Sequence, residues 1–396
     1  MAERTPASPP APDAVPSPLI EDRETLVTEH IATLLQDRWH RFRYAGALRR
    51  GHEPTVLSFT GYGTTSWIRV FSRVVMAPED AFENGRRLSR VVEDGLRGWH
   101  NFTSPPVPYA EVKVLAGGTA FTVRADRGGV VDALIEVEME PGWQTVTLTS
   151  DGSEQATSDV YIVEDGTVTG VVSDIDDTVV VTYLPRPMLA AWNSFVLDEH
   201  ARTATPGMAV MLHRLLEQKP TSPVVYLSTG AWNVAQTLSR FLSRNLYPSG
   251  PLLLTSWGPT EDRWFRSGLE HKVTQLERLA REFPEVRWLL IGDDGQHDPE
   301  IYADFARRHP DKVRAIVIRQ LTPSQALLAG GRATDTRETT PGVPWCYGPD
   351  GAALSAQLEE LGILETGRSA AALLNWPRHA QEAGTGPEPE GHDDAR

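Results

Sequence analysis

The stretch Val171-Val-Ser-Asp-Ile-Asp-Asp-Thr178 passes from an apolar run directly into three carboxylates and a threonine. This is typical of a buried parallel strand that delivers acidic side chains to the carboxyl edge of a sheet. Because side chains two residues apart in an extended segment point the same way, we expect Asp174 and Asp176 to converge and Asp177 to point elsewhere. Converging carboxylates repel unless a proton or a cation lies between them, and Mg²⁺ suits all-oxygen ligands. A carboxylate held in this way can also act as a nucleophile.

The composition limits the class of protein. The chain has 396 residues, of which 40% are hydrophobic and 23% charged, as in a globular protein of about two to three domains. Its single cysteine, Cys346, rules out an internal disulfide and indicates a reducing compartment. No signal peptide begins at Met1, and no segment reaches the ~18 apolar residues of a membrane span, so we expect a cytoplasmic protein.

The charge limits the partners. A formal net charge of −15 argues against nucleic acid and against simple adsorption to an anionic membrane. Any phosphate group that the protein binds must therefore meet a local positive charge. The basic and aromatic segment at 36–50 could make a peripheral membrane contact. A helix packed on the protein with solvated arginines is the favoured interpretation, and the membrane contact stays open.

Changes in composition and in the spacing of apolar residues along the chain predict five segments. From Thr55 to Ile162, period-two runs such as Trp67–Phe71 alternate with glycine turns, which is typical of an antiparallel sandwich. The Pro- and Ala-rich start and the acidic end are typical of disorder. The predicted segments are a disordered lead at 1–18, a helical segment at 19–52, a β-rich accessory domain at 53–165, an α/β candidate catalytic domain at 166–366 and a disordered acidic tail at 367–396.

After Thr167 the pattern switches to alternating apolar strands and helices. Such alternation predicts a mostly parallel sheet with helices on both faces and right-handed crossovers. Ligands of this architecture bind at the carboxyl ends of the strands. The five strand candidates are Val168–Ser173, Val224–Leu227, Leu252–Leu254, Trp288–Ile291 and Ala315–Ile318.

Polar side chains follow two more of these strands. Ser228 and Thr229 come directly after the second strand, where a hydroxyl can hold a phosphoryl oxygen or simply cap a helix. The fourth strand leads into Gly292-Asp-Asp-Gly-Gln-His-Asp298, which can form a second wall of oxygen ligands or an acidic turn. Lys272 follows His271 at the expected start of an amphipathic helix and can supply positive charge, although helical lysines are more often solvated. Because these groups occur together in the α/β half, we interpret them as one site.

This set resembles the four motifs of the haloacid dehalogenase (HAD) superfamily of aspartate-nucleophile phosphotransferases. Asp174-x-Asp-x-Thr178 matches the first motif, Ser228 the second, Lys272 the third and Gly292-Asp-x-x-x-x-Asp298 the fourth. The chain is still more similar to one branch, the actin-patch-associated phosphatidate phosphatase family, which is related to the lipins. The resemblance to that branch covers about residues 168–320 and rests on residues 173–178, 226–232, 271–272 and 292–302.

The resemblance implies an α/β fold with a HAD-like, Rossmann-like parallel sheet, preceded by an N-terminal helix and a β-sandwich-like accessory domain. It also implies that Asp174 attacks phosphorus to form aspartyl-phosphate, and that Asp176 protonates the leaving alcohol and then activates water. Mg²⁺ would be bound by Asp174, the carbonyl of Asp176 and Asp293. The phosphoryl oxygens would be held by Thr178, Ser228 and Lys272, with Thr229 beside them.

Two acids and one loop match the family less strictly. Asp294 or Asp298 would ligate the cation through water or brace Lys272. The loop Ser228-Thr-Gly-Ala-Trp232 lacks the second serine and the proline of the family's Ser-x-Ser-Pro-Trp, which changes the loop beside the phosphate. Residues 179–205 leave room only for a small cap, whose apolar side chains could contact acyl chains or pack on the sheet.

The sequence therefore predicts a Mg²⁺-dependent phosphatase that acts on phosphatidate or a similar phosphomonoester. A HAD-type phosphatase of a soluble phosphorylated metabolite is one alternative, which the net charge favours. A non-catalytic scaffold is another, against which the four filled motif positions argue. The expected partner is thus a phosphorylated substrate, and nucleic acid is not expected.

Overall fold

The computed structural model describes residues 44, 46–78, 104–181, 203–255, 261–295, 297–328 and 339–366. The predicted disordered lead, most of the predicted helical segment and the predicted acidic tail lie outside the described residues. Most of the predicted cap at 179–205, namely residues 182–202, and most of the basic segment at 36–50 also lie outside them.

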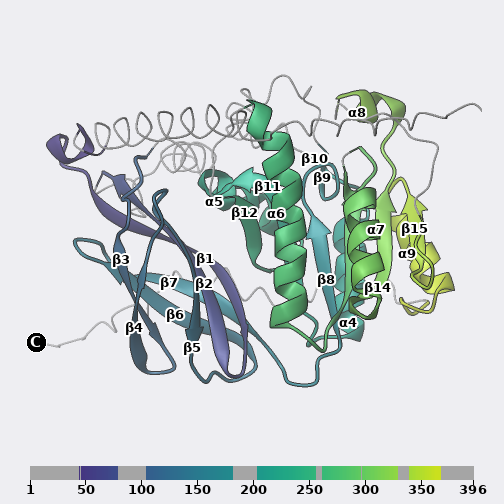
Figure 1. The fold of residues 1–396 in the computed structure, drawn as a ribbon, viewed down its shortest axis with the longest axis horizontal. Helices are drawn as coiled ribbons and strands as arrows, with labels where there is room; N and C mark the ends of the chain where they lie inside the picture. The colour runs from purple at the N-terminus through teal and green to yellow at the C-terminus, as the bar shows by residue number, and fades with distance from the viewer. Residues whose placement is uncertain are drawn as a thin grey trace, which may run out of the picture.

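Seven strands make up the first half of the described chain. They are β1 (Glu53–Thr64), β2 (Trp67–Ala77), β3 (Glu111–Ala116), β4 (Thr119–Arg124), β5 (Val130–Glu136), β6 (Gly142–Ser150) and β7 (Ala156–Val163). They form one sheet in the order β4-β3-β6-β7-β1-β2-β5 (Figure 1). Neighbouring strands are antiparallel except β1 and β7, which run parallel.

This sheet curls until its edge strands β4 and β5 come into contact. Its strands alternate as predicted: in β3, Val112 and Val114 are buried, whereas Glu111 and Lys113 are exposed. The inward-facing side chains of the strands join in one hydrophobic cluster. The predicted β-rich fold of this half is thus confirmed, with the inward and outward alternation that the sequence predicts.

The strands form one continuous curled sheet rather than the two stacked sheets expected of a sandwich. Long strands such as β1 and β2 carry a right-handed twist that accumulates across a sheet. An irregularity in the register between Phe59 and Tyr62 adds to this twist locally. Twist and bulge together explain how one sheet encloses its own core.

A parallel sheet of six strands forms the second half, which confirms the predicted α/β fold. Its strands are β8 (Thr169–Asp174), β11 (Val224–Ala231), β12 (Leu252–Thr255), β13 (Arg287–Asp293), β14 (Val313–Arg319) and β15 (Trp345–Gly348). The order is β12-β11-β8-β13-β14-β15, and every neighbouring pair is parallel. Five of the strands lie where the sequence predicts them. The four-residue edge strand β15 is too short to carry a periodic pattern.

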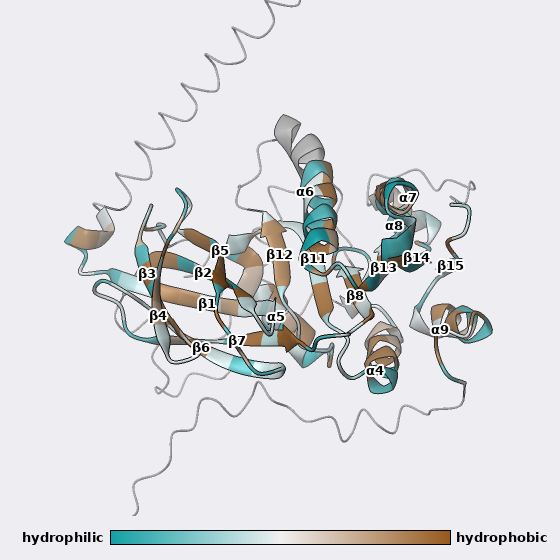
Figure 2. Ribbon diagram, turned by 60° about the horizontal axis from the view of Figure 1, so that its bottom comes forward, coloured by the Kyte–Doolittle hydropathy of each residue, from teal (hydrophilic) through white to brown (hydrophobic). Residues whose placement is uncertain are grey.

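Helices cover both faces of the parallel sheet. They are α4 (Met208–Gln218), α5 (Ala235–Arg244), α6 (Glu261–Glu282), α7 (Asp298–Arg308), α8 (Pro323–Leu328) and α9 (Gly351–Glu360), with short 3₁₀ turns η3 (Trp232–Val234) and η4 (Pro310–Lys312). Helices α6 and α7 lie on one side of the strands and α4 and α9 on the other (Figure 2). A small antiparallel pair, β9 (Val180–Val181) and β10 (Thr203–Ala204), follows β8. None of the described helices combines the length and apolar character needed to cross a membrane.

One prediction about a helix is wrong. His271 and Lys272 do not open a helix but lie in the middle of α6, which begins at Glu261. The apolar periodicity of the sequence starts only near Leu269, because the first turns of α6 are rich in charged residues. Helix start signals based on that periodicity therefore place the start too late.

A single hydrophobic cluster runs through both halves of the molecule. Leu57, Phe59 and Tyr62 of β1 and Phe71 of β2 belong to the same buried cluster as the strands of the parallel sheet. Figure 1 shows β11, β12 and α5 beside the curled sheet, with α6 in front of them. The two halves are therefore joined by a shared apolar core.

Candidate active site

A sharp turn follows the first parallel strand. Asp174 is the last residue of β8, and the amides of Val179 and Val180 both donate to the carbonyl of Ile175 at 3.0 Å. Within this turn Asp177 adopts a left-handed conformation, with φ at 56°. The extended strand thus ends at Asp174, so the alternation of side chains along a strand does not extend to Asp176.

The two acids at first expected to converge have different partners. Asp174 Oδ1 lies 2.6 Å from Lys272 Nζ, whereas Asp176 Oδ2 accepts a hydrogen bond of 2.8 Å from Ser228 Oγ. The carboxylates that gather around Asp174 come instead from the neighbouring strand β13 and from helix α7. The cause is the turn, which redirects the chain after Asp174.

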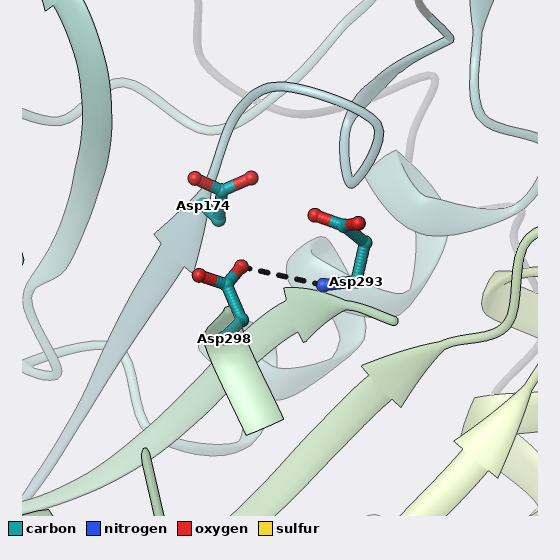
Figure 3. A group of neighbouring side chains, drawn as sticks. All are labelled: Asp174, Asp293 and Asp298. Atoms are coloured by element: carbon teal, nitrogen blue, oxygen red, sulfur yellow. Dashed lines mark hydrogen bonds between the residues drawn. The ribbon is translucent and has the colours of Figure 1, made fainter. Parts of the chain in front are cut away.

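Three buried carboxylates form one cluster (Figure 3). Asp174, Asp293 and Asp298 each offer an oxygen atom, and these atoms all lie within 4.8 Å of one another. Asp293 ends β13, and Asp298 opens α7, where its Oδ2 accepts from the Asp293 amide at 3.4 Å. Asp293 Oδ1 accepts from the Gly295 amide at 2.7 Å.

Glycine at position 292 allows this close approach. A Cβ atom there would lie 2.5 Å from Asp298 Oδ2 and 2.8 Å from the ring of Tyr302. Both distances are shorter than any tolerated carbon contact, so a larger residue would push α7 away from β13. The glycine of the fourth motif is therefore explained by packing between a strand and a helix.

Lys272 reaches the cluster from the middle of α6. Its ammonium lies 2.5 Å from Asp298 Oδ1 as well as 2.6 Å from Asp174 Oδ1, and the side chain is almost fully buried. The adjacent His271 is held near the carbonyl of Leu253, 3.3 Å from Nε2, and burial lowers its pKa to about 4. His271 is thus neutral at pH 7, and the positive charge beside these acids comes from Lys272.

One ammonium does not balance three carboxylates. Burial raises the pKa of Asp174 well above its usual range; Lys272 opposes this, while Asp298 and Asp176 add to it. Burial, followed by Asp298 and Asp174, likewise raises the pKa of Asp293. Burial alone would lower the pKa of Lys272, but Asp174, Asp298 and Asp293 outweigh it and hold that pKa above its usual range. The raised pKa values of Asp174 and Asp293 mean that these acids ionise together only at a cost, which a bound cation would offset.

Unpartnered oxygen atoms provide the test of whether a metal ion fits. Asp174 Oδ2 and Asp293 Oδ2 are buried, and among the described residues neither has a hydrogen-bond partner. Buried polar atoms are almost always satisfied, so these two carboxylate oxygens on adjacent strands are placed to bind a ligand. The donors are all oxygen, which suits a hard divalent cation such as Mg²⁺. The residues present therefore fit the predicted metal.

Three hydroxyl groups were predicted to hold phosphoryl oxygens. Ser228 Oγ lies between the carboxylate of Asp176 and the amide of Gly230, which donates to it at 3.0 Å. Thr178 Oγ1 is buried without a partner in the described part of the chain, so it too has a free hydrogen-bonding position. Thr229 is only half-buried and contributes its carbonyl, which accepts from Thr255 Oγ1 at 3.3 Å.

Asp294 and Asp298 have different partners. Asp298 contacts Lys272 and belongs to the carboxylate cluster. Asp294 is half-buried. Its Oδ1 accepts a hydrogen bond of 2.8 Å from the amide of Leu321, two residues after the end of β14. Of the two acids, Asp298 is thus the one in contact with Lys272, whereas Asp294 is bonded to the segment that follows β14.

Sequence reasoning missed Arg319, the last residue of β14. Arg319 is 4% exposed, and its Nη1 donates to the carbonyl of Asp177 at 2.5 Å. The signal that could have found it is the one used for the other strands: a charged residue directly after the apolar candidate Ala315–Ile318. The fifth strand thus also delivers a polar group to the site.

Comparison with known proteins agrees with this geometry. Residues 169–320 match the family model described as the catalytic domain of phosphatidate phosphatase APP1. The matched residues begin with β8 and end just after β14, so they contain the whole carboxylate cluster together with Lys272 and Ser228. The family resemblance drawn from the sequence is confirmed for this part of the chain.

Two curated relatives match over the same part of the chain. Phosphatidate phosphatase APP1 of Saccharomyces cerevisiae is 25% identical over 151 residues, which cover 38% of this chain and 25% of that protein. The uncharacterized protein C29B5.04c of Schizosaccharomyces pombe is 24% identical over 152 residues, again 38% of this chain and 25% of that protein. The match thus spans about a quarter of each relative.

Solved structures show more distant likenesses. The HAD domain of the effector protein Lem4 from Legionella pneumophila is 17% identical with a TM-score of 0.28, covering 40% of this chain and 89% of that chain. A carbohydrate acetylesterase from Xanthomonas citri is 9% identical with a TM-score of 0.25, covering 70% of this chain and 73% of that chain. Likenesses at these TM-scores do not bear on the activity of this chain.

Proposed function

We propose that this protein is a Mg²⁺-dependent phosphatase that hydrolyses phosphatidate or a similar lipid phosphomonoester through an aspartyl-phosphate. The observation that carries the proposal is the buried group of Asp174, Asp293, Asp298 and Lys272, in which two carboxylate oxygens have no hydrogen-bond partner among the described residues. This group lies at the carboxyl edge of a parallel sheet, where such folds bind ligands. The match of residues 169–320 to a phosphatidate phosphatase family model supports the same reaction class.

In the first step, the carboxylate of Asp174 attacks phosphorus. A bond from Asp174 to phosphorus forms as the bond between phosphorus and the alcohol oxygen breaks. Lys272, 2.6 Å from Asp174, orients this carboxylate and offsets negative charge on the phosphoryl group. Asp298, 2.5 Å from Lys272, holds the ammonium in place.

Asp176 is the proposed acid and base. In its protonated form it gives its proton to the departing alkoxide, and as a carboxylate it then accepts a proton from the water that attacks the aspartyl-phosphate. Water attack releases inorganic phosphate and restores the carboxylate of Asp174. Ser228, 2.8 Å from Asp176 Oδ2, fixes the direction of this carboxyl group.

A bound Mg²⁺ would supply further neutralisation of phosphoryl charge, held by Asp174, the carbonyl of Asp176 and Asp293. The hydroxyl groups of Thr178 and Ser228 would contact the phosphoryl oxygens together with Lys272. Thr178 Oγ1 and Asp293 Oδ2 have no partner among the described residues, which leaves both available for these contacts. Reaction in this site depends mainly on positioning and charge neutralisation, as phosphoryl transfer in general does.

The lipid substrate is the finer part of the proposal, and it rests on the family match. A soluble phosphorylated metabolite is the second candidate, because the net charge of −15 opposes adsorption to an anionic membrane. Either substrate would use the same phosphoryl site. The lipid proposal also implies a cytoplasmic protein that makes peripheral membrane contact to reach its substrate.

Phosphate release from the purified full chain tests the proposal. Phosphatidate in mixed micelles and a soluble aryl phosphate are each offered with Mg²⁺ and with EDTA, and Asp174→Asn is the control for contaminating phosphatases. We expect Mg²⁺-dependent release from phosphatidate well above release from the aryl phosphate. Release from the aryl phosphate alone would contradict the lipid substrate. No Mg²⁺-dependent release from either would contradict the phosphatase itself and favour a non-catalytic scaffold.

A further inference from the structure

The loop that carries Ser228 is anchored in the curled sheet. Trp232 begins η3, four residues after Ser228, and only 4% of it is exposed. Its ring centroid lies 5.2 Å from that of Phe59 in β1 and 5.3 Å from that of Phe71 in β2. These two aromatic residues come from the β-rich half, which supplies none of the predicted site residues. Strands β1 and β2 thus pack against Trp232, the residue that follows the loop.

The opposite side of the same loop is tied to the parallel sheet. Thr255 Oγ1, at the end of β12, lies 3.3 Å from the carbonyl of Thr229 and 3.2 Å from that of Gly230. The amide of Gly230 donates to Ser228 Oγ at 3.0 Å, and Ser228 in turn contacts Asp176. The segment from Ser228 to Trp232 therefore lies between two anchors, one in each sheet.

A second contact between the two halves lies away from this loop. Tyr62 Oη donates to Glu282 Oε2 at 2.6 Å, and Trp67 packs against Phe283 with ring centroids 5.6 Å apart. Glu282 is the last residue of α6, about 15 Å further along the helix than Lys272. This contact joins the halves without touching the Ser228 loop, so it provides a reference for the contact made by Trp232.

We propose that the β1–β2 pair of the accessory half is a positioning element for phosphoryl transfer: Phe59 and Phe71 hold Trp232, and through it the loop that places Ser228 against Asp176. This assignment rests on the proposed phosphatase function, and it gives the β-rich half a role in the reaction rather than in recognition of a separate partner.

The physical reason is the short reach of the interactions in the loop. A hydroxyl that holds a phosphoryl oxygen or orients an acid works only at hydrogen-bond distance, and a displacement of about 1 Å can cost about 100-fold in rate. The loop from Ser228 to Ala231 is the last part of β11, and its pairing with β12 is irregular because the register shifts between Leu227 and Ala231. Side-chain contacts, those of Trp232 and Thr255 among them, therefore add constraint where regular strand pairing is absent.

Two matched substitutions in β2 test this role in the full-length protein. Phe71→Ala removes a contact to Trp232, whereas Trp67→Ala removes the contact to Phe283 and leaves Trp232 untouched. Both residues also contact Tyr62, with ring centroids 5.9 Å and 6.1 Å apart, so both variants weaken the interface between the halves. Hydrogen exchange of the amides at 229–232 and kinetics with a soluble aryl phosphate are measured well below both melting temperatures. Phe71→Leu replaces Phe71→Ala if the alanine variant does not fold.

We expect Phe71→Ala to speed exchange of the Gly230 amide and to lower kcat/KM, each by about tenfold, with the loss mainly in kcat. We expect Trp67→Ala to stay within about twofold of the wild type in both measurements, although its melting temperature falls. Equal kinetic losses in both variants, or unchanged exchange at Gly230 in Phe71→Ala, would overturn the positioning role. If the wild type releases no phosphate, the proposed function fails, and the exchange measurement still decides whether the β1–β2 pair holds the loop.

Discussion

Arg319 Nη1 donates a hydrogen bond of 2.5 Å to the backbone carbonyl of Asp177, a residue 142 positions earlier in the chain. Asp177 has a φ of 56° and follows Asp176 directly, so this bond fixes the turn that carries the proposed acid. The other donors of Arg319 reach the carbonyl of Pro349 at 3.3 Å and Gln325 Oε1 at 3.2 Å. A buried guanidinium thus binds uncharged oxygens and acts as a clamp on the backbone.

Replacement of Arg319 tests this clamp. We expect Arg319→Met to lower kcat/KM by at least about tenfold, because the turn carrying Asp176 loses its fixed position. We also expect a loss of about 2 kcal/mol in the free energy of unfolding, because the carbonyl of Asp177 is left without its donor. Kinetics and urea unfolding measure the two effects. Arg314→Met is the control, since Arg314 lies on the same strand but away from its carboxyl end; equal effects of the two variants would contradict the clamp.

Removal of Lys272 should be costly to the fold as well as to activity. Lys272→Met leaves Asp174 and Asp298 buried without their ammonium partner, and we expect a loss of about 3–5 kcal/mol of stability in EDTA. Adding Asp298→Asn should restore part of that stability, because it removes one of the unpaired charges. Activity should stay absent in both variants. A double variant no more stable than Lys272→Met would show that charge imbalance is not the cause.

Asp174→Asn should separate activity from stability. The substitution removes the proposed nucleophile, so we expect no measurable turnover above background. Because burial and the neighbouring acids raise the pKa of Asp174, loss of its charge should cost little stability in the metal-free protein. Phosphate release and thermal melting in EDTA give the two readings. Turnover near that of the wild type would rule out Asp174 as the nucleophile.

The raised pKa of Asp293 predicts how stability depends on pH and Mg²⁺. In the metal-free protein the folded pKa lies above the unfolded value of about 3.9, so the folded state binds more protons between these two pKa values. The stabilising contribution of Asp293 is therefore complete below the unfolded value and is lost as pH rises through the folded pKa. We expect Asp293→Asn to be more stable than the wild type in EDTA at pH 7 and equal to it near pH 4.

Addition of Mg²⁺ should reverse this order at pH 7. The ion binds the folded wild type, and at about 100 times its Kd it should stabilise that protein by about 2.7 kcal/mol. The variant lacks one of the oxygen ligands, so its melting temperature should respond much less. A Mg²⁺ response equal to that of the wild type would remove Asp293 from the proposed ligands.

The sequence predicts the strands and the polar groups at their ends well, because the apolar pattern of a strand is a local property of the sequence. Each of the five apolar runs in the second half is a parallel strand, and the acids at 174 and 293 lie at strand ends as expected. Lys272 was predicted because it lies between the second and fourth strand candidates, among the other polar groups of the site. The start of its helix was placed at His271, whereas α6 begins at Glu261. These features depend on residues that are neighbours along the chain.

Other features depend on residues far apart in the chain, and the sequence predicted only part of them. It placed Asp174, Asp293 and Asp298 in one site because they follow strand candidates, whereas the separate partners of Asp174 and Asp176 follow from the tertiary structure. Two further contacts also join segments that are distant in sequence. Arg319 donates to the carbonyl of Asp177, and Trp232 packs against Phe59 and Phe71.

The sequence by itself therefore determined which strands form, which of their ends carry acids, a hydroxyl and a lysine, and which reaction class these groups suit. Tertiary structure alone decided the strand order, the partner of each acid, and the closure of seven strands into one curled sheet that packs on the Ser228 loop. The physical reason is that hydrophobic periodicity reports only which side of an element is buried. Strand order and turn conformation follow from long-range packing, where many side chains that are distant in sequence must fit together at once.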